Sequence, residues 1–136
     1  MKLALVVAEF NSEVTFPMEA RARDRARELG AEVARVVHVP GVYDMAPVVK
    51  KLLRKADIDG VVMIGATIKG ETQHDELIAH AIAQAGVNLA IEFEKPVGLA
   101  ITGPGQTDAQ AEARIYRAGH GVEAVVKVVK ALREIG

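Results

Sequence analysis

Short runs of consecutive apolar residues alternate along the chain with longer stretches in which apolar residues recur every three or four positions. The first pattern is typical of strands covered on both faces, and the second of amphipathic helices. The short runs predict strands over residues 3–8, 33–39, 60–65 and 97–102. The recurring pattern predicts helices over residues 12–29, 45–53 and 72–93, and two further helical segments after residue 107.

The start and the end of the third helix rest on different signals. Thr72 followed by Asp75 predicts a capping box in its first turn. Near its end, Asn88–Phe93 could alternatively form a strand, and Gly86 weakens a helix by about 1 kcal/mol relative to alanine. Because the helical period of apolar residues continues without interruption, we prefer a helix through this segment.

Glycine and proline interrupt the pattern in the last third of the chain. Gly103-Pro104-Gly105 predicts the end of the fourth strand. Thr107 with Gln110 forms a capping box, which predicts the start of a helix. Gly119-His120-Gly121 predicts the break between the last two helical segments.

Four strands separated by helices predict a parallel, doubly wound α/β domain. We therefore expect one domain over residues 1–136, with a three-layer flavodoxin-like fold in which helices flank both faces of a four-stranded parallel sheet. In such sheets, ligands bind beyond the carboxyl ends of the strands. The unusual polar, glycine and aromatic residues of this chain follow strand ends, at residues 9–11, 40–44, 69–74 and 102–105.

Composition and charge narrow the possible partners. The chain carries 17 basic and 18 acidic residues, so it lacks the charge signature of a protein that binds nucleic acid or an anionic membrane. No apolar stretch approaches the length of a membrane span. The absence of cysteine excludes disulfides and thiol catalysis, and it fits a cytoplasmic location.

The sequence also predicts that the protein works without a metal or a dinucleotide cofactor. None of its four histidines stands at metal-ligand spacing from another. No G-x-G-x-x-G follows the first strand, and no Gly-Lys-Ser/Thr follows the glycines after the fourth.

The segment GETQHDE after the third strand has two interpretations. A capping box followed by a solvated histidine explains it structurally, and this interpretation has at least equal weight when the segment is taken alone. Functionally, the backbone amides at a helix start bind anions such as phosphate. His74 would feel the positive end of the helix dipole, which favours the neutral imidazole and suits a general base.

Two residues at other strand ends also have a structural and a functional interpretation. Phe10 could cover the edge of the sheet, or its ring could stack on a planar heterocycle. Asp44 is favourable at a helix start whatever its function, but its carboxylate could also accept hydrogen bonds from a polyol.

Taken together, the strand-end segments resemble a known family. EFN follows the first strand, VPGVYDMA the second, IGATIKGETQHDE the third, and KPVGLAITGPGQT contains the fourth. In this order they resemble the 6,7-dimethyl-8-ribityllumazine synthases, and the likeness covers essentially the whole chain. The GPG-x-T form of the last segment is most similar to archaeal members.

The resemblance implies an enzyme without metal or organic cofactor. The family condenses 5-amino-6-(D-ribitylamino)uracil with 3,4-dihydroxy-2-butanone 4-phosphate, the penultimate step of riboflavin biosynthesis. By the same resemblance, His74 would be the acid/base residue. Contacts with the pyrimidine and ribityl groups are implied for Phe10, Asn11, Val42, Tyr43, Asp44, Thr67, Ile68 and Leu99, and contacts with the phosphate for Glu71, Thr72 and Arg114.

The resemblance also implies a homo-oligomer. Family members assemble as pentamers, and some pack twelve pentamers into an icosahedral shell, with active sites between adjacent subunits. Leu99 and Arg114 would then belong to the site of a neighbouring subunit. Leu99 stands where an aromatic residue is usual, Asp44 replaces a longer carboxylate, and Lys69 replaces an arginine.

Three interpretations of the resemblance are open: a lumazine synthase, the related archaeal riboflavin synthase, or a non-catalytic flavin- or lumazine-binding shell protein on the same scaffold. Phe10 and the GETQHD segment argue against the second, because these positions differ in that branch. His74, Thr72 and Arg114 argue against the third, because they would retain the base and the phosphate site. We favour the first, with a flavodoxin-like module that binds FMN as the alternative if the resemblance misleads.

Overall fold

The structure is a computed structural model that describes residues 1–70 and 74–136. Within these ranges the strands are β1 (Lys2–Ala8), β2 (Glu32–Val39), β3 (Gly60–Ile68) and β4 (Val97–Gln106). The helices are α1 (Ser12–Glu28), the short 3-10 helix η1 (Val42–Asp44), α2 (Ala46–Leu53), α3 (Asp75–Phe93), α4 (Asp108–Ala113) and α5 (Arg117–Ile135).

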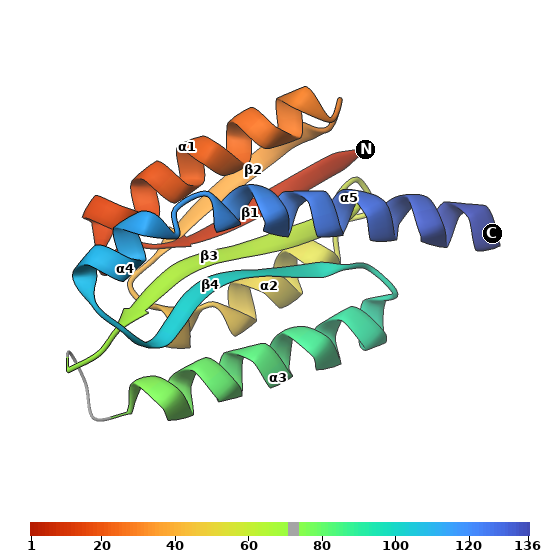
Figure 1. Ribbon diagram of the computed structural model, residues 1–136. Coiled ribbons are helices and arrows are strands. Elements are labelled where there is room, and N and C mark those ends of the chain that lie inside the picture. The colour runs from red at the N-terminus through yellow and green to blue at the C-terminus, as the bar shows by residue number, and fades with distance from the viewer. Residues whose placement is uncertain (71–73) are drawn as a thin grey trace.

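The strands form one parallel sheet in the order β2-β1-β3-β4 (Figure 1). This order agrees with the start of the flavodoxin-like arrangement, and it confirms the predicted fold class. From β1 the chain crosses to β2 on one side, and it then returns to β3 on the other side of β1. The carboxyl ends of β1 and β3 therefore form the switch point, where sheets of this kind leave a crevice for a ligand.

Helices cover both faces of the sheet and create two apolar cores (Figure 1). Alternate residues of a strand point to opposite faces, so β1 contributes to both cores. The core beneath α1 and α5 includes Leu3, Leu5, Val7, Met18 and Val122. The core beneath α2 and α3 includes Ala4, Val6, Val49, Leu53 and Ile82.

Strands β3 and β4 are both longer than the sequence pattern predicted. β3 continues to Ile68, and β4 continues through the Gly-Pro-Gly segment to Gln106. The prediction that Gly103-Pro104-Gly105 ends the strand was wrong, because Ile68 pairs with Gln106 after an irregularity in the register. The backbone amide of Lys69 donates to the carbonyl oxygen of Gln106 at 2.8 Å, which extends this pairing by one further bond.

The third helix begins later than predicted and ends as predicted. His74 occupies the N-cap position of α3, and Asp75 is its first residue. The Asp75 carboxylate accepts a hydrogen bond from the backbone amide of Gly105 at 3.3 Å. Thr72, which the sequence placed in a capping box with Asp75, lies outside the described residues. The preference for a helix through Phe93 is confirmed.

The final helical break also differs from the prediction. Thr107 and Gln110 form the expected capping box at the start of α4, with bonds of 2.9 and 3.1 Å. However, the break falls at residues 114–116, and Gly121 lies within α5. A Cβ atom at Gly121 would lie 3.0 Å from the Cβ of Ala100 on β4. The glycine therefore allows α5 to pack closely on the sheet and does not interrupt the helix.

Candidate active site

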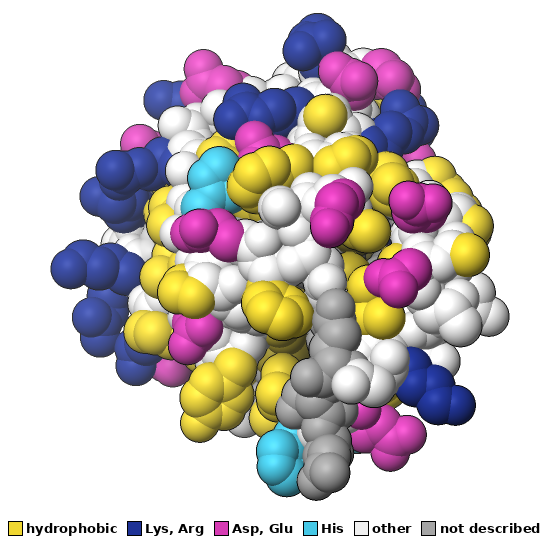
Figure 2. Space-filling model, turned by 90° about the vertical axis from the view of Figure 1, so that its left-hand side faces the viewer, with side chains coloured by type: hydrophobic (Ala, Val, Ile, Leu, Met, Phe, Trp, Pro, Cys, Tyr) yellow, Lys and Arg dark blue, Asp and Glu magenta, His cyan; other side chains and the backbone are white. Residues whose placement is uncertain are grey.

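A pocket of about 220 Å³ opens at the switch point of the sheet. It lies at the carboxyl ends of β1 and β3, next to η1 and the first turn of α3. Its lining is mostly apolar and consists of Ala8, Phe10, Gly41, Val42, Tyr43, Ala66, Thr67, Ile68, Asp75 and Ile78. Figure 2 faces this end of the molecule, where hydrophobic side chains gather towards the middle and Lys and Arg side chains lie mostly around the rim.

The loop after β1 presents an aromatic ring at this pocket. The Phe10 side chain is 61% exposed although it lines the pocket. Its backbone amide donates to the carbonyl oxygen of Pro40 at 3.0 Å, which joins the loop to the end of β2. Asn11 has a left-handed backbone conformation (φ 63°) that asparagine tolerates better than most residues, and its Nδ2 donates to the carbonyl oxygen of Ala66 at 3.0 Å. Asn11 thus holds the loop against β3 and does not itself line the pocket.

The short helix η1 supplies the opposite lip of the pocket. Val42 is buried, whereas Tyr43 is 73% exposed at the mouth. Asp44 lies outside the pocket lining, and its Oδ2 accepts from the backbone amide of Gly41 at 3.0 Å. This bond stabilises the turn that presents Val42 and Tyr43. Asp44 also borders an adjacent hollow between η1, α2 and α3, which it shares with Tyr43.

The end of β3 forms the floor of the pocket. Thr67 and Ile68 line it from the last two positions of the strand. The Thr67 hydroxyl donates to the backbone carbonyl oxygen of Thr102 on β4 at 3.2 Å. Thr67 is therefore fixed by the neighbouring strand, and the extension of β3 beyond its predicted end places both residues within the strand.

His74 lies beside the pocket and not in its lining. It is exposed at the N-cap of α3, and its carbonyl oxygen accepts the first helical bond, from the amide of Ile78, at 2.9 Å. Its two neighbours along the helix start, Asp75 and Ile78, do line the pocket. Glu71 and Thr72, the other candidates in this segment, lie outside the described residues.

Leu99 and Arg114 do not line the pocket of their own chain. Leu99 is 55% exposed on β4, the edge strand of the sheet. Arg114 follows α4, and its Nη1 donates to the Oε1 of Gln106 at 3.1 Å. The pocket in one chain thus contains Phe10, Val42, Tyr43, Thr67 and Ile68 of the predicted site residues, but neither Leu99 nor Arg114.

Comparisons with a family model and with curated relatives all match almost the whole chain to one family. The family model for 6,7-dimethyl-8-ribityllumazine synthase matches residues 1–135. The chain belongs to this family. Among its curated relatives, a 6,7-dimethyl-8-ribityllumazine synthase of Methanococcus aeolicus is 48% identical, with 99% of each chain covered. Proteins of the same name from Methanococcus maripaludis and Methanocaldococcus jannaschii are 50% and 47% identical over 99% of this chain, with 98% and 96% of their own lengths covered.

Membership of the lumazine synthase family agrees with the sequence resemblance, but the structure adds polar residues that the sequence reasoning missed. Asp75 lines the pocket and is bonded to Gly105, although the sequence suggested only a capping function. Gln106 is 1% exposed and is bonded to Arg114. Gln106 could have been noticed as a polar residue directly after Gly-Pro-Gly. It was missed because the predicted fourth strand ended before it.

Proposed function

We propose that this protein condenses 5-amino-6-(D-ribitylamino)uracil with 3,4-dihydroxy-2-butanone 4-phosphate to form 6,7-dimethyl-8-ribityllumazine, with release of inorganic phosphate and water. One observation carries the proposal: the pocket at the β1–β3 switch point is lined by Phe10, Val42, Tyr43, Thr67 and Ile68, the residues that the resemblance assigns to the pyrimidine substrate. The membership of the chain in the lumazine synthase family supports the same reaction.

The pyrimidine would occupy the apolar pocket. The exposed ring of Phe10 can stack on the flat heterocycle, because an aromatic face and a planar ring gain from an offset parallel arrangement. The end of β3, with Thr67 and Ile68, would contact the edge of the ring. Tyr43 and Asp44 stand where the ribityl chain would leave the pocket, and the free capacity of a carboxylate to accept several hydrogen bonds suits its hydroxyl groups.

The phosphate would bind beside the start of α3. Helix N-termini attract anions through their backbone amides and the helix dipole, which supports a role for Glu71 and Thr72. Arg114 would supply a cation to the same group. His74, at the N-cap of α3, would transfer protons as the amine of the pyrimidine attacks the carbonyl carbon of the butanone and as phosphate leaves.

We further propose that the site is completed by a second copy of the chain in a pentamer, which a larger icosahedral shell could contain. Leu99 lies exposed on the edge strand and outside the pocket of its own chain, which fits a contribution to the pocket of a neighbour. Arg114 is likewise outside that pocket. A cytoplasmic location belongs to the same proposal. None of the helices in the described ranges has both the length and the apolar character needed to cross a membrane.

The reaction is tested by mixing the purified protein with both substrates and following the absorbance of the lumazine product. We expect formation well above the uncatalysed background, because holding two reactants in one site removes much of the entropic barrier of a bimolecular reaction. Omitting either substrate is the control. A folded protein that gave only the background rate would contradict the proposed reaction.

Arg114→Ala should raise the KM for the butanone phosphate by at least about tenfold, because a charge-assisted bond to phosphate is lost. The KM for the pyrimidine should change much less. Arg117→Ala removes an exposed arginine three residues further along, and it is the matched control. Steady-state kinetics with each substrate varied in turn measure both constants, and equal changes in the two would count against the phosphate role of Arg114.

A further inference from the structure

Gln106 is a buried polar residue whose side-chain amide has partners on both sides. It ends β4, and it is 1% exposed. Its Oε1 accepts from Nη1 of Arg114 at 3.1 Å, and its Nε2 donates to the hydroxyl oxygen of Thr102 at 2.8 Å. A buried amide that lost these bonds would incur a desolvation cost, so the pairing fixes the side chain in one orientation.

The chemistry of the two partners determines which end of the amide faces which. A guanidinium group only donates hydrogen bonds, so it must face the carbonyl oxygen of Gln106. The Thr102 hydroxyl can accept, and it receives the amide N–H. A glutamate in this place would also accept from Arg114, but it would add a negative charge. Glutamine instead holds the guanidinium without neutralising it.

The backbone connects this pair to the pocket. Gln106 stands opposite Ile68, and its carbonyl oxygen accepts from the amide of Lys69 at 2.8 Å. The Thr102 carbonyl oxygen accepts from the Thr67 hydroxyl at 3.2 Å. Thr67 and Ile68 line the pocket of the same chain, so hydrogen bonds join the pocket floor of one chain to the Arg114 that would serve the neighbouring site.

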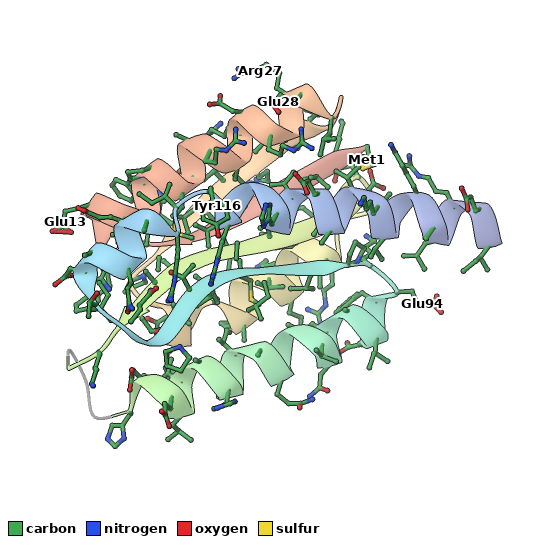
Figure 3. All side chains as sticks on the ribbon, in the orientation of Figure 1. Met1, Glu13, Arg27, Glu28, Glu94 and Tyr116 are labelled. Atoms are coloured by element: carbon green, nitrogen blue, oxygen red, sulfur yellow. The ribbon has the colours of Figure 1, made fainter. Side chains whose placement is uncertain are left out.

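Arg114 itself comes from a turn, in which its backbone amide donates to the carbonyl oxygen of Ala111 at 3.1 Å and its carbonyl oxygen accepts from the amide of Arg117 at 3.0 Å. It lies between α4 and α5, two residues before Tyr116, which Figure 3 marks near the junction of these helices. A long side chain at such a place loses considerable rotamer freedom when it binds a ligand. A bond from one of its five N–H groups to a fixed, buried acceptor reduces that loss before the ligand arrives.

We propose that Gln106 is a positioning residue that holds the Arg114 guanidinium, with its full positive charge, for the phosphate group of the substrate. The inference rests on the proposed function, in which Arg114 binds phosphate. Gln106 acts through Arg114 and does not contact the reacting atoms.

The first test is Gln106→Leu, which keeps a side chain of similar size and removes both amide bonds. We expect the KM for the butanone phosphate to rise about tenfold, while kcat and the KM for the pyrimidine stay nearly constant. Gln84→Leu, on the exposed surface of α3, is the matched control and should change none of these constants. An unchanged KM for the phosphate substrate in a folded Gln106→Leu protein would overturn the inference.

Gln106→Glu provides a second test that does not depend on tolerance of an apolar side chain. Glutamate keeps the length of the side chain and an acceptor for Arg114, so a merely structural role predicts no effect on substrate affinity. The proposal predicts a higher KM for the phosphate substrate, because the carboxylate competes with phosphate for the cation. Wild-type affinity in this variant would overturn the proposal.

A double-mutant cycle distinguishes the possible failures. Binding of inorganic phosphate is measured calorimetrically for the unaltered protein, Gln106→Leu, Arg114→Ala and the double variant. We expect Gln106→Leu to weaken phosphate binding when Arg114 is present and to have no effect when it is absent. A persistent effect without Arg114 would overturn the positioning role, and so would an Arg114→Ala protein that binds phosphate normally. Neither outcome would contradict the proposed reaction, because the lumazine assay tests that reaction separately.

Discussion

His74→Ala should slow lumazine formation by at least about tenfold and leave the fold and the oligomeric state unchanged. The imidazole is exposed at the N-cap of α3, and the helical bond at this position comes from the backbone carbonyl of His74, which the substitution retains. The loss should be moderate for an acid/base residue, because much of the catalysis comes from holding the two substrates together. Single-turnover measurements of lumazine absorbance would report the chemical step directly.

His80→Ala is the matched control for this experiment. His80 is also an exposed histidine of α3, but it lies six residues further along the helix, away from the pocket. Its removal should leave the rate unchanged, while size-exclusion chromatography and circular dichroism should be the same for both variants. A His74→Ala protein with the wild-type rate would remove His74 from the mechanism.

The fold class was predictable because hydrophobic periodicity reports burial directly. Continuous apolar runs such as residues 60–65 belong to strands covered on both faces, and the spacing of apolar residues in α3 carried through Gly86 to Phe93. The order of the strands in the sheet has no comparable signal in the local sequence pattern. The switch point between β1 and β3 results from which strands pair, and the pocket follows from that pairing.

Glycine gave the least reliable local signals, because it has several structural uses. Gly121 was expected near a helix break, but it lies inside α5 and allows close contact with Ala100. Gly103 and Gly105 were expected to end β4, but the strand continues to Gln106. In both cases the reason is a contact with a residue far away in the sequence or in another element, which local propensity does not record.

The candidate site was predictable where its residues follow strand ends and was missed where they depend on pairing between strands. Phe10, Tyr43 and Thr67 come from three such ends, and the fold brings them to one pocket. Gln106 became visible as a functional candidate only once β4 was known to extend beside Ile68. The positions of Leu99 and Arg114 indicate in turn that one chain does not hold all of the predicted site residues together.

Gly103→Ala should cause the largest loss of stability, because Gly103 on β4 packs directly against Thr67 on β3. Gly103 has a backbone φ of 97°, a value that residues other than glycine rarely adopt. A Cβ atom there would overlap with both the backbone oxygen and the hydroxyl of Thr67. The obstacle is the backbone of a buried strand, which cannot rotate away as a flexible side chain could. We expect a loss of about 3 kcal/mol or more in the free energy of unfolding.

Gly105→Ala separates the two causes of this loss. Gly105 also has a positive φ, of 80°, but a Cβ atom there would have no other atom within 4 Å. It should therefore cost only the conformational term, roughly 1–2 kcal/mol. Urea unfolding of both variants at one protein concentration gives the comparison, since association with other copies would change the apparent stability. Equal losses would show that β3 yields easily to the added methyl group, whereas a larger loss for Gly103→Ala would identify the contact with Thr67 as the constraint that keeps the pocket floor in place.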